Sequence, residues 1–127
     1  MPINFQWRDQ DRILLIEHVA PLTFAELEAG LNRLLRYVAD ASQPLHFIAD
    51  WRQAYSYPLQ FSMISKAMAI LRHPNTGYIA LVGVNPSVAF WVEFFAKVTR
   101  WNYGVFPTIN DAVRFLDQIG RIEQVSK

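Results

Sequence analysis

The sequence predicts one α/β domain, spanning residues 1–127, whose elements follow the order β-β-α-β-α-β-α-β-α. A length of 127 residues with 52% hydrophobic side chains suits a single compact core. Short apolar runs bounded by turn residues alternate with segments of helical periodicity. Because strand-helix-strand crossovers are right-handed, we expect a mixed, mostly parallel five-stranded sheet with helices on both faces and the first strand antiparallel to the second.

The first third of the chain predicts a hairpin followed by a helix. Residues 3–7 alternate apolar and polar side chains, residues 8–11 are typical of a turn, and residues 12–19 resume as a more buried strand. Thr23 and Glu26 have the spacing of a capping box. The helix that they begin carries apolar side chains at helical spacing, at Phe24, Leu27, Leu31, Leu34, Leu35 and Val38.

The middle of the chain predicts two further strands with a helix between them. Residues 45–50 form an apolar run that ends in an acid, Asp50. A second helix is expected over about 58–73, since one proline suits its first position and another follows its end. After a turn at 75–77, the apolar run 78–82 between two glycines is typical of a central strand.

The last third predicts a helix, a strand and a final helix. Asn85 is placed to cap a third helix, which has a proline at its first position and ends near residue 101. Residues 103–106 are expected to form the fifth strand. Thr108 is placed to cap the fourth helix, and Gly120 suits its C-terminal end.

Composition excludes several classes of function. The chain has no cysteine, which rules out disulfides, thiolate metal sites and a cysteine nucleophile. It has no apolar run of the roughly 18 residues that a membrane span needs, and residues 1–3 lack the pattern of a signal peptide. We therefore expect a soluble, cytoplasmic protein. Lys and Arg form no cluster, so nucleic acid is not favoured as a partner.

Signatures of catalysis and of cofactor binding are missing. The five glycines are too scattered for a phosphate-binding loop, and the three histidines fall in different elements without metal-ligand spacing. His46 and Asp50 share a strand face but lie about 13 Å apart by strand rise, too far for direct proton transfer. We predict no metal, no cofactor and no enzymatic activity. A pairing of Asp50 with Tyr55 or Ser56 is the one enzymatic route left open.

A candidate site lies where the strand over 45–50 ends. Asp50 is expected at the carboxyl edge of a parallel sheet, with Arg52 as its counter-charge and with Asn85, Ser87 and Thr108 along the same edge. Two interpretations stay open: a polar cluster that binds a ligand or partner, or an acid that closes a loop beside ordinary helix caps. The candidate residues of this loop and edge are Asp50, Trp51, Arg52, Tyr55, Ser56, Tyr57 and Asn85.

The second and third helices carry more apolar surface than one sheet face requires. On the third helix, Phe90, Phe94 and Trp101 lie partly outside the apolar stripe, and the second helix is similarly wide. Three interpretations stay open for this surface. It packs in the core, it contacts a protein partner such as a second copy of the chain, or it lines a slot for an apolar ligand.

The element order, length and spacing resemble the STAS domains, the fold of bacterial anti-sigma-factor antagonists, and the related STAS/SEC14-like lipid-handling group. The antagonists carry an Asp-Ser-Ser/Thr-Gly stretch with a phosphorylated serine; here only the acid, Asp50, has a counterpart, and Ser56 is the nearest hydroxyl. The resemblance implies a non-enzymatic regulatory module that acts through protein contacts, as a homodimer. The alternative that it implies is a carrier or sensor of a small apolar or lipid-like molecule.

Overall fold

The computed structural model describes residues 3–19, 22–54 and 61–125, with the backbone alone for residues 61–62 and 120–125. The element order is the one predicted from the sequence. The strands are β1 (Ile3–Asp9), β2 (Ile13–Val19), β3 (Leu45–Gln53), β4 (Thr76–Val82) and β5 (Tyr103–Phe106), and the helices are α1 (Phe24–Asp40), α2 (Phe61–Arg72), α3 (Pro86–Thr99) and α4 (Ile109–Val125).

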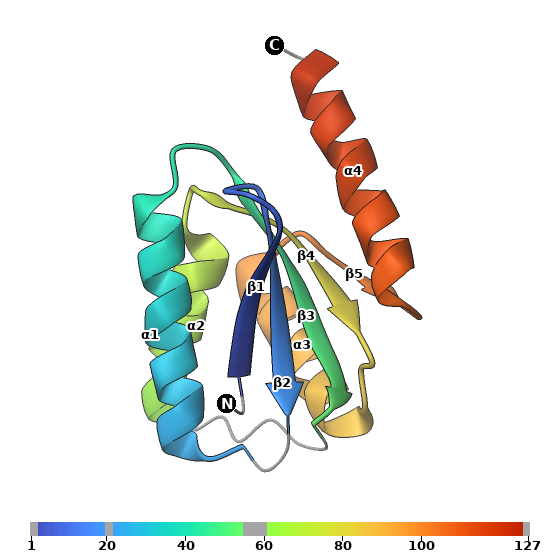
Figure 1. Ribbon diagram of the computed structural model, residues 1–127. Coiled ribbons are helices and arrows are strands. Elements are labelled where there is room, and N and C mark those ends of the chain that lie inside the picture. Colours follow the sequence, from blue (N-terminus) through green and yellow to red (C-terminus); the bar gives the residue numbers. More distant parts are fainter. Residues whose placement is uncertain (1–2, 20–21, 55–60, 126–127) are drawn as a thin grey trace.

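The five strands form one mixed sheet in the order β1-β2-β3-β4-β5. Strand β1 pairs with β2 in antiparallel fashion, and the other three pairings are parallel. In Figure 1, α2 and α3 lie behind the sheet with α1 beside them, whereas α4 lies on the near side. The predicted mixed sheet with helices on both faces is therefore confirmed.

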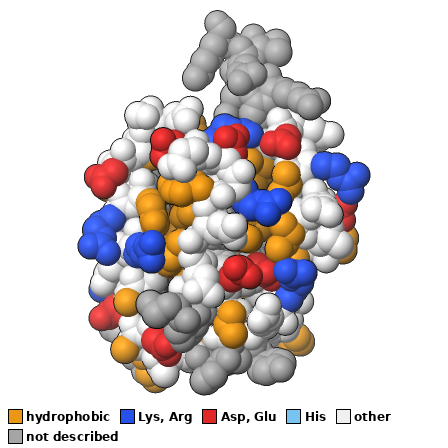
Figure 2. Space-filling model, viewed as in Figure 1, with side chains coloured by type: hydrophobic (Ala, Val, Ile, Leu, Met, Phe, Trp, Pro, Cys, Tyr) orange, Lys and Arg blue, Asp and Glu red, His pale blue; other side chains and the backbone are white. Residues whose placement is uncertain are grey.

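Side-chain alternation along the strands divides the core into two layers. On β3, Phe47, Ala49 and Trp51 point into the larger layer, which α1, α2 and α3 cover. Ile48 points to the opposite face and packs with Leu116 of α4. Near α4, hydrophobic side chains reach the surface between acidic and basic ones (Figure 2).

Side-chain caps begin three of the helices, as the sequence predicts. Thr23 and Glu26 form the reciprocal capping box of α1. The Oδ1 atom of Asn85 accepts a hydrogen bond from the Val88 amide at the start of α3 (3.0 Å). Thr108 accepts one from the Asp111 amide at the start of α4 (3.1 Å). These bonds satisfy amides that have no partner within the helix.

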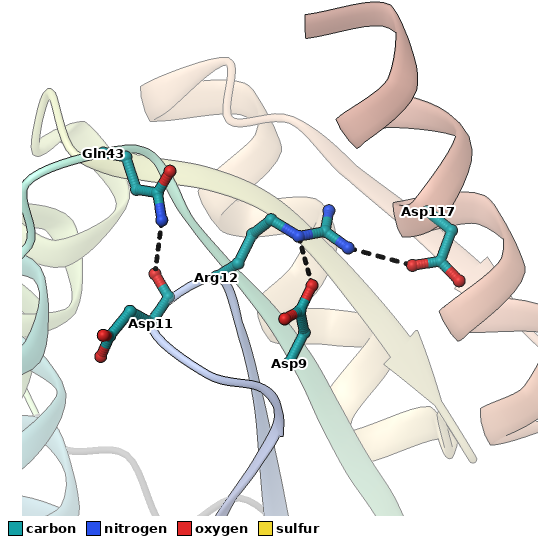
Figure 3. A network of polar contacts seen from close by, with 5 residues as sticks. All are labelled: Asp9, Asp11, Arg12, Gln43 and Asp117. Atoms are coloured by element: carbon teal, nitrogen blue, oxygen red, sulfur yellow. Dashed lines mark hydrogen bonds and ion pairs between the residues drawn. The ribbon is translucent and has the colours of Figure 1, made fainter. Parts of the chain in front are cut away.

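The hairpin between β1 and β2 is tied to two distant segments (Figure 3). Arg12 donates hydrogen bonds to Asp9 within the hairpin and to Asp117 of α4 (3.0 Å). Gln43, which follows α1, donates to the carbonyl of Asp11 (3.3 Å). The Arg12–Asp117 pair thus links α4 to the far edge of the sheet.

Several predicted boundaries were wrong. Strand β3 continues to Gln53, because Gln53 still pairs with Val19 of β2; Trp51 and Arg52 therefore belong to the strand and not to a loop. Strand β4 begins at Thr76, which was placed in a turn, because Thr76 pairs with the start of β3.

Two helix ends also differ from the prediction. Helix α3 ends at Thr99, because Arg100 adopts the left-handed conformation (φ +53°) that closes a helix. Helix α4 does not end at Gly120, because the helix continues to Val125. The predicted start of α2 near Pro58 lies outside the described residues.

Candidate functional site

Strand β3 ends in an ion pair between Asp50 and Arg52. Asp50 is 2% exposed, and alternation places it on the same sheet face as Ile48, which packs against α4. Arg52 donates to both carboxylate oxygens, from Nε to Oδ1 and from Nη2 to Oδ2, each at 2.9 Å. The predicted counter-charge is therefore present, in the two-pronged geometry that arginine and carboxylate favour.

A β-bulge creates this arrangement. Glu17 pairs with Asp50 and Val19 pairs with Gln53, so β3 has one residue more than β2 over this stretch. Within the bulge, the amide of Arg52 donates to Asp50 Oδ1 at 3.0 Å. The carboxylate thus accepts a backbone amide in addition to the guanidinium.

The electrostatics keep Asp50 ionised. Burial raises the pKa of Asp50, but the hydrogen bonds and positive charge of Arg52 outweigh it and hold the pKa below its ordinary value. A carboxylate stabilised in this way is a weak proton acceptor. Through these contacts the carboxylate joins Arg52 to the end of β3.

Gly83, directly after β4, gives Arg52 the space that the ion pair needs. Its φ of +74° lies in the left-handed region that favours glycine. A Cβ at this position would lie 2.5 Å from Arg52 Cγ and 2.7 Å from the Arg52 backbone nitrogen. Any larger residue would therefore push β3 and β4 apart at the site.

On the opposite face of the sheet, His18 and Trp51 form a stacked pair. Their ring centroids are 3.6 Å apart and the rings are nearly parallel, at 8°. The His18 Nδ1 atom lies 3.1 Å from the Asp50 carbonyl oxygen, which can only accept, so Nδ1 carries the proton. His18 is 7% exposed, and burial lowers its pKa to about 4 despite that hydrogen bond and the Asp50 charge. The ring is neutral at pH 7.

His18 and Trp51 form part of the wall of an apolar cavity of about 110 Å³. The cavity lies between the sheet and the helices α1, α2 and α3. Asp50 and Arg52 do not line it, and the link to Asp50 runs through the His18 hydrogen bond. The lining residues are Ile16, His18, Leu31, Leu34, Phe47, Ala49, Trp51, Ala67, Ile70, Leu71, Ile79, Leu81, Val88, Trp91, Val92, Phe95 and Trp101.

The other candidate residues divide into separate groups. Phe94 and Trp101 are half-buried and pack against the larger core layer, whereas Phe90 is 63% exposed. Asn85 donates from Nδ2 to the Ala54 carbonyl (2.9 Å) and so joins the ends of β3 and β4. The remaining candidates, Tyr55, Ser56 and Tyr57, lie outside the described residues.

The structure brings Trp51 and Trp101 to one cavity, and it places Asp50 and Arg52 on the other sheet face. Sequence reasoning missed His18 as a cavity residue and treated it as an ordinary strand residue. The available signal was alternation, since Leu14, Ile16 and His18 share one face of a buried strand.

Comparison with known proteins gives a fold and no activity. No protein-family model matches the chain, and no curated protein matches it. A solved structure of an uncharacterized DUF3478-family protein from Shewanella loihica PV-4, described as having a SpoIIAA-like fold, aligns with a TM-score of 0.61. The chain has a SpoIIAA-like fold. The alignment covers 90% of this chain and 91% of that one at 18% identity. This fold is that of the STAS domains, as the sequence predicts.

Membrane-spanning helices and metal-binding clusters are both absent from residues 3–19, 22–54 and 61–125. No helix there is long and apolar enough to cross a membrane. Within the same ranges, no three His, Asp or Glu side chains come together in a group that could hold a metal ion.

Proposed function

We propose that the protein is a non-enzymatic module of SpoIIAA-like fold that binds a small apolar molecule between its sheet and helices α1–α3. The observation that carries this proposal is the apolar cavity of about 110 Å³. Apolar cavities of this order in proteins stay dry and admit molecules such as benzene or xenon. A ligand that fills the space replaces contacts that the surrounding side chains otherwise lack.

A ligand in the cavity is favoured over empty space by the packing contacts that it restores. The side chains around the cavity lack packing partners on the side that faces it, and these missing contacts lower the stability of the folded state. A bound apolar molecule recovers part of this cost, so binding and stability should rise together.

An NMR titration with toluene tests the proposal. We expect toluene to shift amide resonances of cavity-lining residues and to raise the free energy of unfolding. In Ala67→Leu, the larger side chain occupies the cavity and should abolish both effects. Ala29→Leu places the same substitution on the exposed surface of α1 and should leave binding unchanged. Equal toluene binding by Ala67→Leu and the wild type would contradict the proposal.

A second candidate function, contact with a protein partner, rests on exposed apolar side chains of α3 and β5. Phe90 is 63% exposed and Val105 is 57% exposed, and β5 is an edge strand. Exposed apolar groups beside an unpaired strand edge favour protein contacts, most simply with a second copy of the chain. Sedimentation of the wild type and of Phe90→Ser tests this candidate. A dimer that the substitution weakens supports it, whereas a wild type that is monomeric at high concentration contradicts it.

A further inference from the structure

The cavity wall is chemically uneven. Among the 17 lining side chains in the described part of the chain, thirteen are hydrocarbon, three are tryptophans and one is a histidine. An indole N–H can only donate a hydrogen bond, so His18 is the one side chain among these 17 that can accept one. No charged side chain is among them.

The tautomer of His18 determines which ring nitrogen can accept a hydrogen bond. Nδ1 donates to the Asp50 carbonyl oxygen (3.1 Å) and is therefore protonated. In the neutral ring, Nε2 then carries a lone pair. Stacking on Trp51 at 3.6 Å and 8° fixes the plane of the ring. Two contacts thus hold the imidazole ring in a set orientation, and His18 is one of the described residues that line the cavity.

The geometry points to a ligand class: a small, uncharged, largely apolar molecule that carries one hydrogen-bond donor and donates it to Nε2 of His18. Alcohols, phenols and indoles have this chemistry. The inference rests on the proposed function and specifies the ligand of the same cavity.

Charged ligands fit this cavity poorly. A carboxylate or ammonium group would lose its hydration there, and none of the described lining residues offers a counter-charge, so its binding would be costly. A ligand without any polar group would fill the space but would form no hydrogen bond with His18 Nε2. A single uncharged donor meets both requirements.

Three probes of similar size separate the alternatives. Phenol can donate and accept, anisole can only accept, and toluene can do neither. We expect wild-type protein to bind phenol more tightly than anisole or toluene, by roughly two- to tenfold, the effect of one neutral hydrogen bond. If anisole binds as tightly as phenol, and both bind more tightly than toluene, then the indole donors of the wall recognise the ligand and the inference is overturned.

The variant His18→Phe isolates the accepting nitrogen. It retains a flat ring against Trp51 and removes both ring nitrogens. The ratio of toluene to phenol dissociation constants should fall by the same roughly two- to tenfold factor, because ligand hydration cancels in the comparison. Trp91→Phe, an aromatic replacement in the same wall, should leave the ratio unchanged.

The outcomes distinguish the two proposals. If no probe binds the wild type, the proposed function fails and this inference fails with it. If all three bind with a ratio that His18→Phe does not alter, the cavity binds ligands and only the inference is overturned. If His18→Phe does not fold, ¹⁵N spectra of the wild type decide: phenol should shift the His18 Nε2 resonance, and toluene should not. An Nε2 resonance that phenol leaves unmoved overturns the inference.

Discussion

Lowering the pH should destabilise the protein through His18. The folded protein holds this ring neutral, with a pKa of about 4, because the ring is buried. In the unfolded chain a histidine has a pKa near 6.5. As the pH falls below that value, the unfolded chain binds a proton that the folded protein does not, so acid favours unfolding.

The magnitude follows from the two pKa values. The contribution is fully present above pH 6.5, declines between pH 6.5 and pH 4, and is constant below. Over that window the free energy of unfolding should fall by about 3 kcal/mol. Asp50 acts at lower pH. Its folded pKa lies below the ordinary value, so the stability that it contributes is lost as the pH falls from the ordinary value through the folded value.

Urea denaturation at pH steps from 8 to 4.5 measures this effect. The difference in free energy of unfolding between the wild type and His18→Phe cancels the other titrating groups. We expect that difference to shrink toward acid by about 1 kcal/mol or more per pH unit at its steepest. A difference that stays constant over this range would refute the reasoning, because it would mean that His18 titrates alike in both states.

Three substitutions test the remaining contacts. Asp50→Asn should lower the free energy of unfolding by about 2 kcal/mol in urea denaturation at pH 7, since it removes the buried partner of Arg52. A change below about 0.5 kcal/mol would contradict the conclusion that the Asp50–Arg52 ion pair stabilises the end of β3. Gly83→Ala should lower the free energy of unfolding by roughly 1–3 kcal/mol in the same assay, because of the positive φ at this position and the nearby backbone of Arg52. An unchanged free energy of unfolding would contradict the close contact between Gly83 and Arg52. Asp117→Asn should lower the free energy of unfolding by only about 0.5 kcal/mol, because the ion pair between Asp117 and Arg12 is half-exposed. Hydrogen exchange should show faster opening of α4 in this variant. Unchanged exchange would contradict the idea that the Arg12–Asp117 pair holds α4 to the hairpin.

The element order could be predicted because each element carries local signals. The capping box at Thr23 and the cap at Asn85 begin helices where the sequence places them, and the apolar run before Asp50 forms the central strand. The end of that strand could not be predicted locally. The strand continues to Gln53 because Gln53 pairs with Val19, which is far away in the sequence. This pairing follows a β-bulge that no local sequence pattern predicts.

The site was predictable only in part for the same reason. The Asp50–Arg52 ion pair joins residues two apart, and the sequence identified it. The stack of His18 on Trp51 joins two strands through their register, and the cavity depends on how three helices pack against the sheet. Side-chain packing of this kind is set by volumes and rotamers across the whole core, which periodicity does not specify.

The most direct test of the central claim is a crystal structure determined under xenon pressure. Xenon enters apolar protein cavities and gives strong density, so the account predicts a xenon peak between the sheet and helices α1–α3, against Trp51 and Phe95. The peak should vanish in Ala67→Leu. A wild-type crystal without xenon at this position, or with ordered water in its place, would contradict the claim that the cavity is a binding site for a small apolar molecule.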